Sequence, residues 1–135
     1  MESAANHPSG RTILVVDDEQ DIRDLYSLIL EKLGYQVLLA RTSDEVVECY
    51  HQSLENSVPI DVVILDLNLP DGRGGKEIAG VLRAMDPHAR LIVSSGHTTA
   101  PEMTHYAEYG FNGALEKTFN RGNIKRTIEQ VLASG

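Results

Sequence analysis

Apolar residues recur along the chain in five short runs, separated by longer stretches with helical spacing. Three runs, at residues 12–16, 60–65 and 91–94, are nearly all β-branched residues or leucine. Continuous apolarity of this kind is typical of strands that are covered on both faces of a parallel sheet. A fourth run covers 35–40, and a weaker one at 112–116 is assigned mainly because it continues the rhythm. The pattern therefore predicts five strands.

The stretches between the runs carry the periodicity of amphipathic helices. Gly34 stands where the first helix needs a C-terminal cap, and Thr42 or Ser43 can cap the second helix at its N-terminus. Gly110 follows the fourth helix. The apolar positions that define the five helices are Ile22, Leu25, Tyr26, Ile29 and Leu33; Val46, Val47, Tyr50 and Leu54; Ile78, Leu82 and Met85; Met103, Tyr106 and Ala107; and Ile124, Ile128, Val131 and Leu132.

Five strand–helix units with right-handed crossovers predict an α/β fold, a doubly wound five-stranded parallel sheet with helices on both faces. For five strands we expect the flavodoxin-like strand order 2-1-3-4-5. Residues 1–10 are small and polar, which predicts a disordered N-terminal segment. Residues 11–135 are expected to form one domain.

Composition and charge narrow the function classes. The chain has 20 acidic residues against 12 lysines and arginines, a net charge of −8, which disfavours direct binding of nucleic acid or an anionic membrane. No apolar run approaches the roughly 20 residues that a membrane-spanning helix needs. Cys49 is the only cysteine, so no disulfide can form within the chain, and a reducing compartment is favoured. We expect a cytoplasmic protein.

Polar side chains gather where the predicted strands end. Asp17 and Asp18 follow the first strand, Asp66 the third, Ser95 lies at the end of the fourth and Lys117 follows the fifth. In an open α/β sheet, ligands bind outside the carboxyl ends of the strands, at the point where the strand order reverses. That point lies between the first and third strands, so the three aspartates are expected to converge there.

Several carboxylates at one place need a compensating cation or a proton. Oxygen ligands without imidazole or thiolate suit Mg²⁺, which also accepts phosphate oxygens. A carboxylate can itself act as a nucleophile and form an aspartyl phosphate. A metal, a lysine and a hydroxyl would then neutralise the oxygens of the transferring group. The predicted site therefore suits phosphoryl chemistry.

The polar residues lie in four segments that resemble the receiver domain of two-component response regulators. The segments are 13–19 (ILVVDDE), 61–72 (DVVILDLNLPDG), 92–96 (IVSSG) and 116–119 (EKTF). Each is short, but their order and spacing together are highly specific. The resemblance covers residues 11–132 and includes receivers of hybrid sensor histidine kinases.

The resemblance implies that Asp66 is the phosphoacceptor, which takes a phosphoryl group from a phosphohistidine. The donor would be a histidine kinase or a histidine phosphotransfer protein, in the same polypeptide or another. Ser95 would reach the phosphoryl group with its hydroxyl, and Lys117 would pair with its oxygens. Activation would repack the surface of the fourth helix, fifth strand and fifth helix, through which a homodimer can form. The domain would not be an enzyme beyond accepting the group and slowly losing it again.

The metal site implied by the resemblance uses four residues and holds Mg²⁺. The carboxylates of Asp18 and Asp66 and the backbone carbonyl of Asn68 would be ligands. Asp17 would hold the metal directly or through its water molecules. These assignments agree with the preference of Mg²⁺ for oxygen ligands.

Two positions depart from the family pattern. Ala114 stands where the family usually has an aromatic residue three positions before the lysine, so the aromatic half of the usual switch is missing. Thr118 follows Lys117, where the family usually has a proline after a cis peptide bond. A cis bond before a residue other than proline costs about 3–4 kcal/mol, so we expect a trans bond or a strained loop.

Two other classes of protein compete with the phosphorylated switch. Phosphatases of the haloacid dehalogenase type also form an aspartyl phosphate, but they need an acid two residues after the nucleophile, and Asn68 stands there. An interaction module that signals without phosphate would keep the fold alone, and the departures at Ala114 and Thr118 favour that reading. The complete set of three aspartates, serine and lysine favours phosphorylation.

Overall fold

The computed structural model describes residues 10–69, 75–97, 99–117 and 120–133. Its centre is a five-stranded parallel sheet with the strand order β2-β1-β3-β4-β5, which confirms the predicted topology. The strands are β1 (Thr12–Val16), β2 (Gln36–Ala40), β3 (Val62–Asp66), β4 (Leu91–Ser95) and β5 (Gly113–Glu116). Residues 1–9, for which disorder is predicted, lie outside the described residues.

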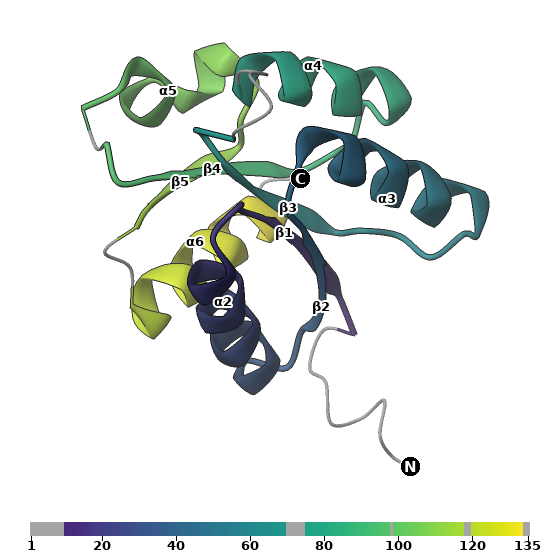
Figure 1. The fold of residues 1–135 in the computed structure, drawn as a ribbon, viewed down its shortest axis with the longest axis horizontal. Coiled ribbons are helices and arrows are strands. Elements are labelled where there is room, and N and C mark those ends of the chain that lie inside the picture. Colours follow the sequence, from purple (N-terminus) through teal and green to yellow (C-terminus); the bar gives the residue numbers. More distant parts are fainter. Residues whose placement is uncertain (1–9, 70–74, 98, 118–119, 134–135) are drawn as a thin grey trace.

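Helices cover both faces of the sheet, as Figure 1 shows. Helices α2 and α6 lie on one face, and α3, α4 and α5 lie on the other. The helices are α2 (Gln20–Lys32), α3 (Ser43–Glu55), α4 (Gly75–Met85), α5 (Pro101–Thr104) and α6 (Arg121–Ala133), with a 3₁₀ helix η1 (Tyr106–Tyr109) after α5. Each face therefore has its own hydrophobic core.

The two cores follow from the alternation of side chains along the inner strands. Ile13 and Val15 of β1 pack with α2 and α6, whereas Leu14 and Val16 pack with α3 and α4. All five residues of β1, of β3 and of β4 are buried, as their continuous apolarity predicts. Strand β2 lies at the edge of the sheet and is largely exposed.

The buried face of α2 differs from the predicted stripe by a small rotation. Leu25 is expected inside, but 41% of it is exposed. Tyr26 and Leu30 are the fully buried residues, with Ile22 and Ile29 partly buried beside them. Both stripes fit a helical period, so the spacing alone does not choose between them. Tyr26 belongs to both stripes, and its hydroxyl contacts Ser94 of β4 at 2.9 Å.

The fourth predicted helix is short and interrupted. Helix α5 ends at Thr104, and His105 has φ −127° and ψ 46°, which lies outside the helical region. The Thr104 hydroxyl contacts the His105 ring at 2.9 Å. The 3₁₀ helix η1 follows and ends at Gly110, whose φ of 92° is the left-handed conformation of a C-terminal cap.

Arg83 of α4 ties the helix to the segments on either side of β4. Its guanidinium donates to the backbone oxygens of Gly110 at 3.0 Å and Ala89 at 2.9 Å, and to Asn112 Oδ1 at 2.7 Å. Asn112 Oδ1 also accepts from the backbone N–H of Leu91 at 2.8 Å. One side chain therefore holds the loops that position the start of β4 and of β5.

We expect Arg83→Met to lower the free energy of unfolding by at least about 2–3 kcal/mol, because one hydrogen bond from a charged donor contributes about 1.5–3 kcal/mol and Arg83 makes three. Urea unfolding followed by circular dichroism measures the change. Arg126→Met is the control, because Arg126 is exposed and donates to Asn123 of its own helix. Equal effects of the two substitutions would contradict the bracing role of Arg83.

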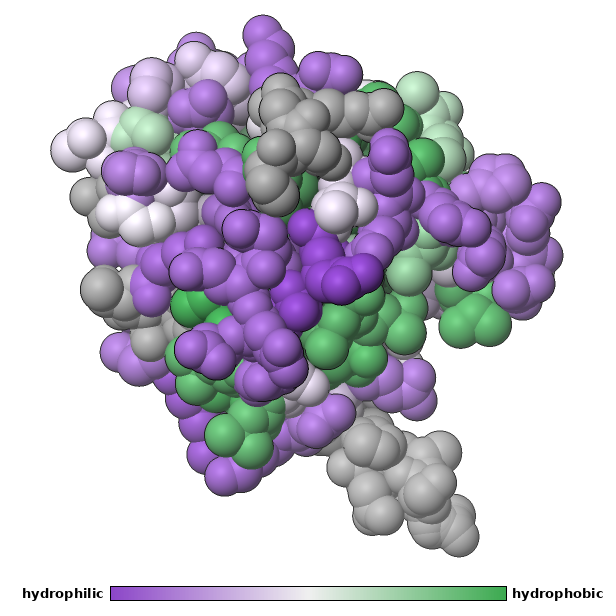
Figure 2. Space-filling view, in the orientation of Figure 1, coloured by the Kyte–Doolittle hydropathy of each residue, from purple (hydrophilic) through white to green (hydrophobic). Residues whose placement is uncertain are grey.

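The surface is mostly hydrophilic, with separate hydrophobic patches (Figure 2). Exposed leucines lie on α2 and on the edge strand β2, and Leu54 and Val58 are exposed at the end of α3 and beyond it. Within the described part of the chain, no helix combines the length and the apolar character that crossing a membrane requires.

Candidate functional site

The carboxyl ends of β1 and β3 bring the predicted aspartates together. Asp66 is the last residue of β3, and Asp17 directly follows Val16 of β1, which pairs with Leu65. Asp17 and Asp66 are only 1% and 3% exposed, whereas Asp18 is exposed. One carboxylate oxygen from each of the three aspartates lies within 4.8 Å of the others. The expected convergence therefore occurs at the point where the strand order reverses.

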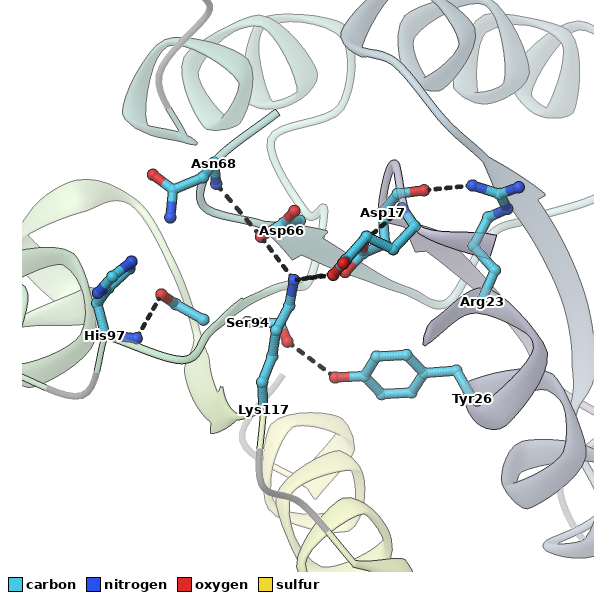
Figure 3. Close-up of polar contacts among 10 residues, drawn as sticks. Asp17, Arg23, Tyr26, Asp66, Asn68, Ser94, His97 and Lys117 are labelled. Atoms are coloured by element: carbon cyan, nitrogen blue, oxygen red, sulfur yellow. Dashed lines mark hydrogen bonds and ion pairs between the residues drawn. The ribbon is translucent and has the colours of Figure 1, made fainter. Parts of the chain in front are cut away.

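Lys117 directly follows β5 and reaches the two buried carboxylates, as Figure 3 shows. Its Nζ lies 2.8 Å from Asp17 Oδ2 and 3.2 Å from Asp66 Oδ1. Glu19 Oε1 lies 3.9 Å from the same ammonium. The ammonium thus supplies the positive charge that a group of buried carboxylates needs.

The acid–base properties of the site follow from burial and charge. Burial raises the pKa of Asp66 above its usual value, and the negative charge of Asp17 raises it further, against the opposing effect of Lys117. Burial alone would lower the pKa of Lys117, but its contacts with Asp17 and Asp66 outweigh burial, and the pKa lies above the usual value. Lys117 is therefore a charged ammonium at neutral pH.

Backbone N–H groups orient both buried carboxylates. Glu19 donates its N–H to Asp17 Oδ1 at 3.0 Å, and Asn68 donates its N–H to Asp66 Oδ1 at 3.3 Å. Asn68 therefore lies beside Asp66, where sequence reasoning expects its carbonyl to serve as a ligand. Since Lys117 also contacts Asp66 Oδ1, two donors on one oxygen fix the plane of that carboxylate.

Ser95 is buried at the end of β4, one strand away from Asp66. Its Oγ accepts a hydrogen bond from the backbone N–H of His97 at 2.9 Å. That bond uses a lone pair of the oxygen, so it does not consume the hydroxyl proton. Ser95 is therefore placed near the site with a proton that it can donate.

Two further polar contacts near the site were not anticipated from the sequence. Arg23 of α2 donates through Nη1 to the backbone oxygen of Asp17 at 2.8 Å. The hydroxyls of Tyr26 and Ser94 lie 2.9 Å apart in a buried hydrogen bond. Tyr26 fits the apolar stripe of its helix, and only its hydroxyl signals a polar role. Its partner Ser94 is the polar end of an apolar strand.

The donor set fits a hard divalent cation such as Mg²⁺. Three carboxylates supply oxygen ligands, and no other group of histidine, cysteine and acidic residues with this spacing occurs among the described residues. Asp17 Oδ2 is buried and meets Lys117 as an ion pair without the angles of a hydrogen bond. That oxygen is therefore able to ligate a cation, and the acidic cluster is compatible with Mg²⁺ binding.

One departure from the family pattern, Ala114, lies within β5. Ala114 is half-buried against the core of the α3–α4 face. A surface hollow of about 270 Å³ adjoins it, lined by Tyr106, Ala114, Thr127 and neighbouring residues of β5 and α6. The absence of a ring at this position thus coincides with open space. Thr118 lies outside the described residues, as does the predicted geometry of the bond before it.

A doubly wound parallel sheet with three carboxylates, a hydroxyl and a lysine at its carboxyl edge defines the receiver class of signalling domains. The family model described as the response regulator receiver domain matches residues 13–129. The chain therefore belongs to the response regulator receiver domain family.

Similar proteins agree with this family. The photosynthetic apparatus regulatory protein RegA of Rhodobacter capsulatus is 30% identical over 134 residues, which covers 99% of this chain and 68% of RegA. The CAI-1 autoinducer sensor kinase/phosphatase CqsS of Vibrio cholerae is 36% identical over 88 residues, 65% of this chain and 12% of CqsS. The solution structure of the beryllofluoride-activated NtrC4 receiver domain dimer superimposes with a TM-score of 0.80 at 28% identity, covering 91% of this chain and 97% of that one.

Many of these relatives are much longer than this chain. It spans 15%, 12% and 23% of the length of three curated relatives. The similarity therefore concerns the receiver portion of those proteins.

Proposed function

We propose that this domain accepts a phosphoryl group from a phosphohistidine onto Asp66, with Mg²⁺ as cofactor, and that it thereby regulates a partner. The observation that carries the proposal is the arrangement around Asp66. Its buried carboxylate lies within 4.8 Å of two others and 3.2 Å from a lysine ammonium. Ser95 completes the set on the adjacent strand. A site with this composition suits a group that carries several negative oxygens.

In the proposed reaction, a carboxylate oxygen of Asp66 attacks the phosphorus of the donor. A bond between that oxygen and phosphorus forms as the phosphorus–nitrogen bond of phosphohistidine breaks, and the imidazole leaves with the electron pair and takes up a proton. Asn68 and Lys117 orient the attacking carboxylate through Oδ1. Bound Mg²⁺, held by Asp17, Asp18, Asp66 and the carbonyl of Asn68, would supply positive charge to the phosphoryl oxygens.

The chain's own donors act on the remaining oxygens. Lys117 is charged and partly buried beside Asp66, so it can shift from the carboxylates to an oxygen of the phosphoryl group with little loss of charge pairing. Ser95 can donate its hydroxyl proton while its oxygen still accepts from His97. Slow loss of the phosphoryl group to water would return the domain to its starting state, without an enzymatic activity toward other substrates.

The proposed donor is a histidine kinase or a histidine phosphotransfer protein in the cytoplasm. A sensor kinase/phosphatase among the relatives supports a donor in the same polypeptide or in another one. We also propose that the surface of α5, β5 and α6 is where a homodimer forms after phosphorylation. The activated NtrC4 receiver is a dimer, and Tyr106 is exposed on this surface.

The test is incubation of the domain with acetyl phosphate, with and without Mg²⁺, followed by intact-mass measurement. We expect one added phosphoryl group, only when Mg²⁺ is present. If no adduct forms, beryllofluoride binding measured by fluorine NMR separates rapid hydrolysis from an inactive site. Failure of both measurements would overturn the proposal and favour a phosphate-independent interaction module.

A further inference from the structure

A buried hydroxyl pair lies directly beneath the acidic site. Tyr26 of α2 and Ser94 of β4 are each 1% exposed, and their oxygens lie 2.9 Å apart. Figure 3 shows the tyrosine reaching from its helix toward the strand that ends beside Lys117. The rest of this core is apolar, formed by residues such as Ile13, Ile92 and Ile128. A buried hydroxyl is retained at such a place only when it has a partner.

The backbone of Ser94 is also held in place by its neighbours in the sheet. It pairs in register with Asp66, and its backbone oxygen accepts from the N–H of Leu67 at 2.9 Å. The next residue along the strand is Ser95, whose side chain leaves the opposite face. A shift of Ser94 would therefore move the proposed phosphoryl-binding hydroxyl and the strand end next to Asp66.

Helix α2, which carries Tyr26, is also bonded to the acidic loop of Asp17 and Asp18. Helix α2 begins at Gln20, directly after the acidic residues Asp17, Asp18 and Glu19. Arg23, one turn before Tyr26, holds the backbone oxygen of Asp17 at 2.8 Å. Helix α2 is thus bonded at one point to the acidic loop and at another to β4. Through these two contacts, helix α2 links the loop that carries the carboxylates of Asp17 and Asp18 to the strand that carries the hydroxyl of Ser95.

The electrostatic setting keeps this pair neutral. Burial raises the pKa of Tyr26 well above its usual value, and the nearby charges of Asp17 and Asp66 act in the same direction. The tyrosine is therefore protonated at neutral pH and can donate or accept a hydrogen bond. Its contribution is positional and adds no charge to the site.

We propose that Tyr26 and Ser94 act together as positioning residues for phosphoryl acceptance, by fixing the separation between the loop of Asp17 and Asp18 and the end of β4. This inference rests on the function proposed above. Transfer needs the carboxylates, the lysine and the hydroxyl aligned on one phosphoryl group, and a misplacement of 1 Å costs about a hundredfold in rate. A hydrogen bond that holds two of the contributing elements at a fixed distance controls this alignment.

The test compares Tyr26→Phe, Ser94→Ala and the double variant in the rate constant for acceptance from saturating acetyl phosphate and Mg²⁺. We expect each single variant to be about tenfold slower, a fraction of the cost of a full 1 Å misplacement. The double variant should be no slower than either one, because either substitution already removes the bond. Mg²⁺ affinity should change less than twofold, since the carboxylates remain.

Tyr50→Phe is the matched control. Tyr50 is as deeply buried, and its hydroxyl donates to Asp86 Oδ2 at 2.7 Å, between α3 and the end of α4. The Tyr50→Phe variant should be less stable than the wild type but should accept a phosphoryl group at the wild-type rate. All rates are measured at a temperature where circular dichroism shows every variant folded. If Tyr26→Phe does not fold, Ser94→Ala carries the test.

The outcomes are distinguishable. Wild-type rates in Tyr26→Phe and Ser94→Ala, or an equal loss in Tyr50→Phe, would reduce the pair to a structural role and overturn the inference. A double variant about a hundredfold slower would mean that the two residues act independently, which also overturns it. If the wild-type domain neither accepts a phosphoryl group nor binds beryllofluoride, the proposed function fails and the inference fails with it.

Discussion

Asp66→Asn is expected to abolish phosphoryl acceptance and, at the same time, to stabilise the metal-free domain. The amide is not a nucleophile toward phosphorus, so no adduct should appear in the intact mass at any Mg²⁺ concentration. Asp66 is 3% exposed, and burial and the charge of Asp17 raise its pKa. The folded state therefore disfavours its ionised form. A neutral residue of the same shape should raise the free energy of unfolding by about 0.5–2 kcal/mol.

The gain in the free energy of unfolding from Asp66→Asn should increase with pH. At low pH the carboxyl is protonated in the folded and unfolded states, and the two proteins should differ little. As pH rises through the usual pKa and then the raised one, the unfolded state of the wild type gains ionisation that the folded state resists. The stability difference should therefore grow with pH and remain at neutral pH. Urea unfolding in a chelating buffer at several pH values measures it.

Asp61→Asn is the control for that experiment. Asp61 lies just before β3, at the opposite end of the strand, where its Oδ2 accepts from the backbone N–H of Thr12 at 2.8 Å and its Oδ1 faces Arg11. The variant should accept a phosphoryl group at the wild-type rate and should not gain stability. An adduct on Asp66→Asn would place the phosphoacceptor elsewhere.

Lys117→Met is expected to change two properties of the site in opposite directions. The ammonium contacts the oxygens of Asp17 and Asp66 that a divalent cation would use, so its removal should strengthen Mg²⁺ binding. The same ammonium is the proposed partner of a phosphoryl oxygen, and loss of one such donor typically costs about 10²–10³-fold in rate. Phosphoryl acceptance should therefore fall by that factor even with saturating Mg²⁺.

Isothermal titration with Mg²⁺ and the time course of the intact mass with acetyl phosphate test these two expectations. Lys125→Met is the control, because Lys125 is exposed on α6 and the methionine is the same in both variants. A weaker affinity for Mg²⁺ in Lys117→Met would show that the lysine supports the metal site and does not compete with it. An unchanged rate would remove Lys117 from the proposed reaction.

The sheet could be predicted from the sequence because strands that are buried on both faces consist mainly of apolar residues. Apart from polar residues at their ends, the inner strands β1, β3 and β4 consist of large apolar residues, and every one of their residues is buried. Helix faces were harder to predict. Leu25 and Leu30 both fit the period of α2, and only the packing of that helix against the sheet shows which one is inside. The break after Thr104 is likewise not signalled by the spacing, because Tyr106 and Ala107 continue the apolar pattern beyond it.

The acidic site could be located from the sequence because strand ends in a parallel sheet share one edge. Asp17, Asp66 and Lys117 meet there, as their positions after the strands predict. The Tyr26–Ser94 bond could not be predicted in the same way. It joins residues that are distant in the chain, and a tyrosine in an apolar stripe is equally consistent with simple packing. The roles proposed for the acidic site and for the Tyr26–Ser94 pair in phosphoryl acceptance stay predictions.

The lysine at the acidic site has a consequence for how the chain folds. Asp17 and Asp66 stand at the ends of neighbouring strands formed early in the sequence, but the ammonium between them follows the last strand, β5. When only the first three strands of a nascent chain have been synthesised, the two carboxylates come together without a counter-charge. Their repulsion then opposes the pairing of the strands at that edge. Part of that counter-charge arrives when β5 docks and brings Lys117, and a dissolved divalent cation could supply the rest. Because the complete domain carries this ammonium itself, we expect it to fold without added magnesium.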